Sequence, residues 1–253
     1  MCSNLPFPSS SHKLPLDRFR FNQDGTFPFM GGPIFAEVYQ TVSKMSVTTG
    51  TVYYLQGTLG SGESHILAAL VCLLIKEGKR VVYLPEAKPL ATDLVGYTQY
   101  ALQLAYADDE VLFERIQGFS SMTDILKFAK ERSRRGEWWY LICDQMNTLY
   151  HFPNTDNSLG PDAQPEALQF IQRLSEDHYF ICAKPQDTDR QGNYGPSLTV
   201  EVFPADCCRL PDLTATDFER GHVLAGIVAR SVQVEQPAFP GLILHVTAGP
   251  LPP

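Results

Sequence analysis

The segment from Gly57 to Ser64 carries residue types that bind phosphate. Its letters are GTLGSGES. They fit the phosphate-loop pattern G-x-x-x-x-G-K-[ST] at every fixed position except the lysine, which is replaced by Glu63. Glycines let backbone amides turn inward and approach phosphate oxygens without side-chain hindrance. The segment therefore predicts a phosphate site, and the alternative is a glycine-rich turn that binds nothing. The residues of the predicted site are Gly57, Thr58, Gly60, Ser61, Gly62, Glu63, Ser64 and His65.

Ser64 and Asp144 are the candidate magnesium ligands. A serine at the end of a phosphate loop normally ligates Mg²⁺, and an aspartate at the tip of a nearby strand holds the same ion. Asp144 follows the apolar run from Trp138 to Cys143, which predicts such a strand. Gln145 comes next and is a weak catalytic candidate, because an amide cannot act as a carboxylate base. The expected ligands are ATP and Mg²⁺.

The elements that must position these residues alternate between strands and helices. Apolar residues at helical spacing, short β-branched runs and flanking glycines or prolines mark them. Strands are predicted at Val52–Leu55, Val81–Leu84, Trp138–Cys143 and Tyr179–Cys182, and helices at Phe35–Met45, Ser64–Lys76, Glu166–Leu174 and most of 88–133. This alternation predicts a doubly wound α/β fold of the P-loop NTPase type, with a mainly parallel sheet and helices on both faces.

The predicted domain spans residues 28–182. Residues 1–27 are rich in Pro, Ser and Phe without a sustained period, and they predict a loosely ordered leader. Only about fifteen mostly polar residues separate the fourth strand from the apolar run Leu198–Phe203, and a parallel crossover needs a dozen or more, usually helical. Residues 183–253 are therefore interpreted as a divergent or incomplete end of the fold.

Charge and composition narrow the classes of partner. The chain has 253 residues and a formal net charge of −8, which repels a phosphate backbone and makes nucleic acid an unlikely partner. The longest apolar run, Ile66 to Ile75, is about half a membrane span, so no membrane is expected. Dispersed cysteines without ligand spacing predict a reduced intracellular protein, cytoplasmic or nuclear.

Two longer segments extend the comparison. The run that ends at Glu86 reads GTLGSGESHILAALVCLLIKEGKRVVYLPE, and a later run reads WWYLICDQMNTL. Together they resemble the P-loop NTPase domain of Crinkler-type and retrotransposon-hot-spot-type proteins over roughly residues 28–182. The resemblance implies an ATPase module, often joined to a C-terminal effector domain and, if effector-like, delivered to a host cell. It places Gly57, Gly60, Gly62 and Ser64 in the phosphate loop and Asp144 at Mg²⁺, and it puts Gln145 where many relatives carry a water-activating glutamate.

The Glu63 substitution leaves three functional hypotheses open. A lysine near the β- and γ-phosphates contributes roughly 4 kcal/mol per charge pair at 4 Å and an effective dielectric of 20, and a carboxylate reverses the sign. The first hypothesis is a nucleotide-binding module degenerate in hydrolysis. The second is an interaction protein, with a protein partner, that keeps the fold without nucleotide. The third is an active ATPase with a relocated cation, for which Lys184 and Arg190 are candidates.

A cluster of basic residues precedes the third predicted strand. Its interpretation is a solvated helix end, since cations favour the carboxyl end of a helix. Docking to nucleic acid or to an acidic partner is the alternative. The cluster consists of Lys127, Lys130, Arg132, Arg134 and Arg135.

Overall fold

The computed structural model describes most of the chain as a mixed α/β protein. The described residues are 2–9, 14–47, 51–57, 62–150, 163–185, 197–204, 230–234 and 243–248. The strands are β1 Cys2–Pro6, β2 Thr26–Met30, β3 Thr51–Gly57, β4 Val81–Leu84, β5 Tyr140–Cys143, β6 Tyr179–Pro185, β7 Ser197–Pro204, β8 Arg230–Val234 and β9 Ile243–Ala248. The helices are α1 Pro33–Ser43, α2 Glu63–Lys76, η2 Lys88–Ala91, α3 Leu94–Ala105, α4 Glu110–Gln117, α5 Met122–Arg134, α6 Asn147–Tyr150 and α7 Ala163–Ser175.

The main sheet has the strand order β4-β5-β6-β3-β7-β9-β8. Strands β4, β5, β6 and β3 are parallel to one another, which confirms the prediction of a parallel sheet for this half. Because β6 lies between β3 and β5, the glycine-rich loop and Asp144 follow strands that are not direct neighbours. The chain crosses from β3 to the far edge at β4 and then returns strand by strand.

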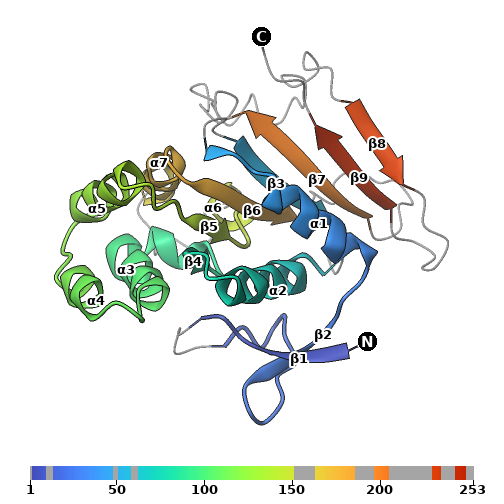
Figure 1. The fold of residues 1–253 in the computed structure, drawn as a ribbon, viewed down its shortest axis with the longest axis horizontal. Coiled ribbons are helices and arrows are strands. Elements are labelled where there is room, and N and C mark those ends of the chain that lie inside the picture. The colour runs from blue at the N-terminus through green and yellow to red at the C-terminus, as the bar shows by residue number, and fades with distance from the viewer. Residues whose placement is uncertain are drawn as a thin grey trace.

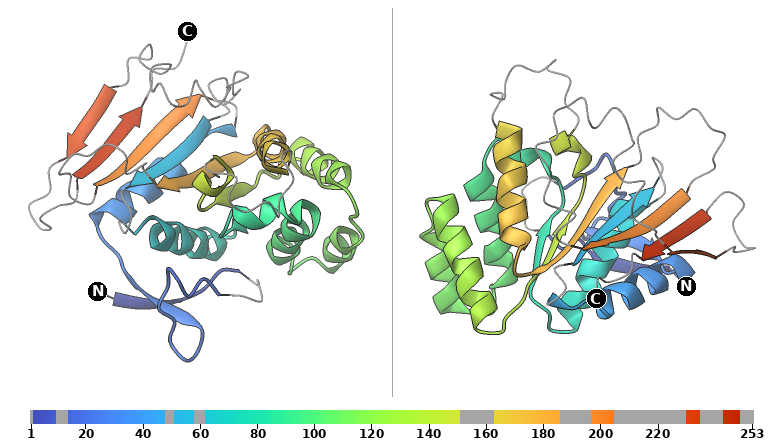
Figure 2. Two further views of the ribbon diagram at one scale, coloured as in Figure 1. Left: turned by 180° about the vertical axis from the view of Figure 1, so that it is seen from behind. Right: turned by 90° about the horizontal axis from the view of Figure 1, so that it is seen from above.

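Helices cover both faces of the parallel half, as predicted (Figures 1 and 2). One face packs against α1 and α2, through residues such as Val42 and Leu70. The other packs against α3, α5 and α7, through residues such as Leu102, Phe128 and Phe170. Alternate residues of each strand enter the two cores, as the pleat requires. All four residues of β4 and of β5 are therefore buried.

The described residues 2–9 and 14–30 differ from the loosely ordered leader expected at 1–27. Strands β1 and β2 form an antiparallel hairpin that lies beside α2 (Figure 1). Phe7, Phe19 and Phe27 are buried in the core that α2 shares with the sheet. The spacing of these rings follows neither a helix nor a strand period, so their burial depends on a surface contributed by distant residues.

The region after β6 extends the sheet within the ranges described. Strand β7 pairs with β3 in the antiparallel direction. An antiparallel return needs no helical crossover, so the short polar connection that counted against a further parallel strand is sufficient. Strand β9 continues the sheet beside β7, and β8 lies at its edge. Residues 183–253, interpreted from the sequence as a divergent or incomplete end of the fold, contribute these three strands within the described ranges.

Candidate functional site

The predicted site lies at the edge of the sheet where the parallel strands end. Strand β3 ends at Gly57, and α2 begins at Glu63. Glu86 follows β4, and Asp144 follows β5 directly. In open α/β sheets this carboxyl edge is where ligands bind. Three of the predicted loop residues, Thr58, Gly60 and Ser61, lie outside the described residues.

Gly62 sets the start of α2. Its backbone has φ 91° and ψ 15°, a left-handed conformation that glycine adopts at little cost. Its carbonyl accepts the first helical hydrogen bond, from the Ile66 amide at 3.0 Å. Glu63 follows in the first turn, and only 9% of it is exposed. A carboxylate is favourable at this positive end of the helix, although it stands where a phosphate loop carries lysine.

Arg18, from the N-terminal segment, reaches the same point. Its Nη1 donates to Asp144 Oδ2 at 2.7 Å, to the Pro85 carbonyl at 3.2 Å and to Ser64 Oγ at 3.4 Å. Its Nη2 donates to Glu86 Oε1 at 3.1 Å. The Arg18 side chain is 13% exposed and that of Asp144 only 2%, so this ion pair is largely withdrawn from water. The two predicted magnesium ligands do come together, around a guanidinium.

A short turn and an aromatic anchor hold Arg18 in place. The backbone amides of Arg18 and Phe19 both donate to the Pro15 carbonyl, at 3.1 and 3.0 Å. The buried Phe19 ring stacks on His65 of α2, with ring centroids 4.4 Å apart. Burial and the Arg18 charge lower the pKa of His65, which favours the neutral ring. The predicted phosphate-site residue His65 therefore contacts the leader.

Asp144 is a buried carboxylate with several partners. Burial raises the pKa of its carboxyl group, and the hydrogen bond with Ser64, the Arg18 charge and the Gln145 amide oppose that shift. The backbone amide of Gln145 donates to Asp144 Oδ1 at 2.8 Å. With Arg18 on one oxygen and this amide on the other, both carboxylate oxygens are held in fixed directions.

Gln145 adopts a conformation that few residues other than glycine adopt. Its φ is 57°, in the left-handed region. Its carbonyl accepts from the amide and the hydroxyl of Thr148, at 3.0 and 2.8 Å. This turn directs the backbone N–H of Gln145 towards the Asp144 carboxylate. The backbone contacts give Gln145 a structural task, whether or not its side chain has a catalytic one.

These residues do not fit a magnesium ion while Arg18 is in place. Mg²⁺ needs oxygen ligands at about 2.0–2.1 Å in near-octahedral geometry. An ion between Ser64 Oγ and Asp144 Oδ2 would overlap the Arg18 Nη1 that already donates to both. Across the described ranges, no group of three or more His, Cys, Asp and Glu side chains could hold a metal ion.

Arg18 was not among the predicted site residues. The sequence feature that could have indicated Arg18 is the segment from Arg18 to Phe21, in which arginine and phenylalanine alternate. Such a period of two predicts an extended, half-buried segment, but it does not say which surface the segment covers. The sequence instead offers Lys184 and Arg190 as candidates for a relocated cation. The backbone of Lys184 lies in β6. The side chain of Lys184 and the whole of Arg190 are not among the residues and side chains that the structure describes.

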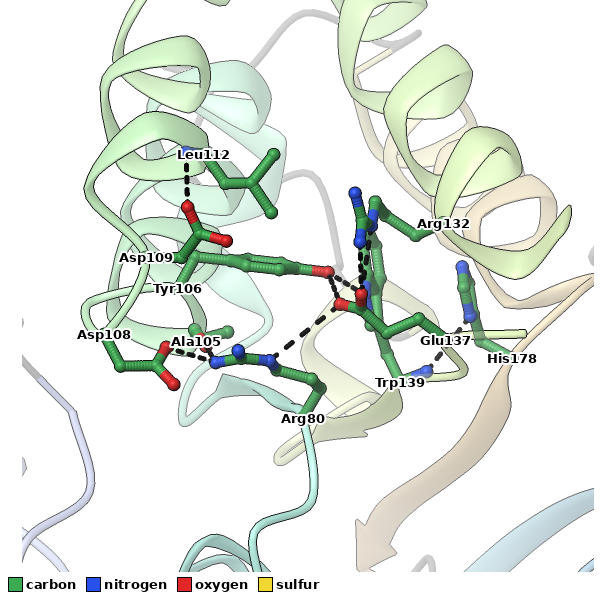
Figure 3. A network of polar contacts seen from close by, with 10 residues as sticks. All are labelled: Arg80, Ala105, Tyr106, Asp108, Asp109, Leu112, Arg132, Glu137, Trp139 and His178. Atoms are coloured by element: carbon green, nitrogen blue, oxygen red, sulfur yellow. Dashed lines mark hydrogen bonds and ion pairs between the residues drawn. The ribbon is translucent and has the colours of Figure 1, made fainter. Parts of the chain in front are cut away.

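A second polar network lies at the opposite edge of the sheet, where the strands begin (Figure 3). Glu137 accepts hydrogen bonds from Tyr106 and from Arg132. Trp139 Nε1 donates to the Tyr106 hydroxyl at 2.8 Å, and Arg80 lies over the Tyr106 ring. The network joins α3, α5 and the start of β5, so its role is structural.

The predicted basic cluster is partly neutralised by this network and its neighbours. Lys130 pairs with Asp177 at 2.8 Å, and Arg135 pairs with Glu131 at 3.0 Å. Arg132 pairs with Glu137 of the network. Lys127, Lys130, Arg134 and Arg135 are nevertheless exposed. The ion pairs and this exposure agree with the solvated helix end expected from the sequence, and they favour it over a surface that binds nucleic acid.

Comparisons with known proteins leave the family open. No protein-family model matches the chain, and no curated protein matches it. Among the described helices, none is long and apolar enough to cross a membrane.

Proposed function

We propose that this chain is a degenerate P-loop nucleotide-binding module in which ATP hydrolysis is weak or absent. The observation that carries the proposal is the contact of Arg18 with both Ser64 and Asp144. Efficient phosphoryl transfer depends on Mg²⁺ bridging the β- and γ-phosphates. A protein whose magnesium ligands are engaged by its own arginine lacks that contribution.

The buried Glu63 supports the same proposal. A charge pair at about 4 Å and an effective dielectric of 20 is worth roughly 4 kcal/mol. Replacing lysine by glutamate turns this attraction to phosphate into repulsion. Every 1.4 kcal/mol is about a tenfold change in affinity, so nucleotide binding should be weaker by several decades. Stabilisation of the transition state should suffer more, because charge develops there.

Arg18 does not favour the active ATPase hypothesis. A cation that replaces lysine must keep donors free for phosphate. The Arg18 guanidinium instead directs Nη1 at Asp144 and the Pro85 carbonyl, and Nη2 at Glu86. Most of its donors are therefore turned towards the protein.

The charge balance at this edge favours a second candidate, an interaction protein that binds no nucleotide. The carboxylates of Asp17, Glu86 and Asp144 pair with a single Arg18 in the described part of the site, and Glu63 adds a fourth carboxylate in the first turn of α2. Such an excess of negative charge opposes a phosphate ligand. In either case, the resemblance to Crinkler-type and retrotransposon-hot-spot-type proteins suggests an effector-like or mobile-element-like origin.

Calorimetry with ATP separates the two candidates. The proposal expects weak binding by the wild type, in the high micromolar to millimolar range, and at least tenfold tighter binding by Glu63→Lys. Glu114→Lys, on the exposed side of α4, makes the same charge change away from the site and should leave the affinity unchanged. Absence of binding by the wild type at millimolar ATP would favour the interaction protein.

Steady-state phosphate release tests the second half of the proposal. The wild type should release phosphate at a rate close to the background, with or without Mg²⁺. A wild-type rate that depends on Mg²⁺ and equals the rate of Glu63→Lys would show that the electrostatic argument is wrong.

A further inference from the structure

We infer that Arg18 is the resident cation of this site, standing in for a divalent metal, and that its removal uncovers a latent metal site. The inference deepens the proposed function, and what it implies for nucleotide binding rests on that proposal. The physical claim itself concerns oxygen atoms and a guanidinium, so it can be tested without nucleotide.

The guanidinium of Arg18 is surrounded by hard oxygen donors. Four oxygen atoms lie within hydrogen-bonding distance of its two terminal nitrogens: Asp144 Oδ2, Ser64 Oγ, the Pro85 carbonyl and Glu86 Oε1. Carboxylate, hydroxyl and carbonyl oxygens are the ligands that Mg²⁺, Ca²⁺ and Mn²⁺ prefer. These four oxygen atoms would suit a divalent cation, and the monovalent guanidinium of Arg18 contacts them instead.

The leader keeps Arg18 in this position. Phe19, the next residue, is 2% exposed, and Phe27 and Phe7 of the same hairpin are buried beside it. Burying a Phe side chain contributes about 1.5–3 kcal/mol. Withdrawing the leader would therefore lose the burial of three rings together with the ion pairs. The burial of these rings therefore holds Arg18 in the site.

Removing the guanidinium changes the electrostatics of the site. Asp144 is buried, and Arg18 is its partner on Oδ2. A buried carboxylate without a cation is costly, so Asp144 should either take up a proton or recruit a cation from solution. Glu86, which is 40% exposed, leaves a path to water on one side. A divalent ion can therefore enter when the arginine is gone.

Titration with Mn²⁺, followed by electron paramagnetic resonance, tests the inference in the full-length chain. The wild type should show no binding that depends on Asp144 up to about millimolar Mn²⁺. Arg18→Met keeps an apolar stem against the leader and removes the charge, and Arg18→Ala removes both. Each should bind Mn²⁺ at least tenfold more tightly than the wild type, and Asp144→Asn added to either should abolish the gain. Arg20→Ala, an exposed arginine two residues away, should behave as the wild type.

Two results would overturn the inference. The first is binding of Mn²⁺ by the wild type that equals that of Arg18→Met and is lost in Asp144→Asn. The second is a folded Arg18→Met that binds no Mn²⁺. If both Arg18 variants unfold, a loss of Mn²⁺ signal in Asp144→Asn relative to the wild type still contradicts the inference. Since no nucleotide is present, neither result depends on whether the protein binds ATP.

Discussion

His178 illustrates how a single residue is controlled by its surroundings. Its ring stacks on Trp139 with centroids 4.3 Å apart and planes 7° from parallel. Its Nδ1 accepts from the Trp139 amide at 3.1 Å, which requires that nitrogen to be unprotonated. Burial lowers the pKa of His178 to about 4, against the opposing charges of Asp177 and Glu137. The histidine is therefore neutral at pH 7.

This lowered pKa predicts a loss of stability in acid. Between about pH 6.5 and pH 4 the unfolded chain binds a proton at His178 and the folded chain does not, so the free energy of unfolding falls as the pH falls through that window. The contribution is on the order of 3 kcal/mol, since each pKa unit corresponds to about 1.4 kcal/mol. Urea unfolding at several pH values should show a flatter dependence for His178→Phe than for the wild type. Equal pH dependence in the two proteins would contradict the assignment.

At the scale of elements, the N-terminal hairpin completes a core that α2 and the sheet leave open. Phe19 packs against Phe7 and Phe27 in edge-to-face contacts. The sulfur of Cys72 on α2 lies 3.2 Å from the Pro6 carbonyl at the end of β1, and burial raises the pKa of this thiol to about 11. The hairpin therefore contributes to the stability of the domain as well as delivering Arg18.

Phe19→Ala should destabilise the protein by about 3–5 kcal/mol, because it leaves a cavity between the hairpin and α2. Leu16→Ala, in the same turn, is the matched control: Leu16 is 74% exposed, so the free energy of unfolding should change by less than about 0.5 kcal/mol. Chemical denaturation measures both. A Phe19→Ala effect as small as that of Leu16→Ala would mean that the hairpin is not packed as described.

Tyr106 is the corresponding anchor on the other face of the sheet. Tyr106→Phe keeps the ring but leaves Trp139 Nε1 without its acceptor and Glu137 without one donor. A buried polar group left unpaired costs about 1–3 kcal/mol. Asp108→Asn removes charge from an exposed pair with Arg80 in the same network and should cost less than about 1 kcal/mol. Equal losses, measured by denaturation, would show that the Tyr106 hydroxyl has no special role.

On the scale of the whole molecule, the two charged sites occupy opposite edges of one sheet. Arg80 stands before β4 and Pro85 after it, so the two sites are separated by about 16 Å of strand at 3.3 Å per residue. The free-energy changes of Arg18→Met and Tyr106→Phe should therefore add within about 0.5 kcal/mol. The double variant, measured by urea denaturation, tests this. A coupling above 1 kcal/mol would mean that the sheet transmits strain between its edges.

Local pattern was sufficient for much of the architecture. The apolar run Val81–Leu84 is β4 without a change of boundary, and the mostly helical region expected at 88–133 contains α3, α4 and α5. These elements are encoded by residues close together in the chain, through side-chain period and turn chemistry. The convergence of Ser64 and Asp144 at one edge also followed from the parallel order of strands.

Tertiary structure alone decided what lies between Ser64 and Asp144. Arg18 is 46 residues from the first and 126 from the second, and no local period records either separation. Its position depends on the burial of Phe19 in the core shared by α2 and the sheet, and that core exists only after they have packed. Charge complementarity then completes the contact. Local sequence pattern therefore encodes the strands and helices that carry Ser64 and Asp144. Long-range packing places Arg18 between them.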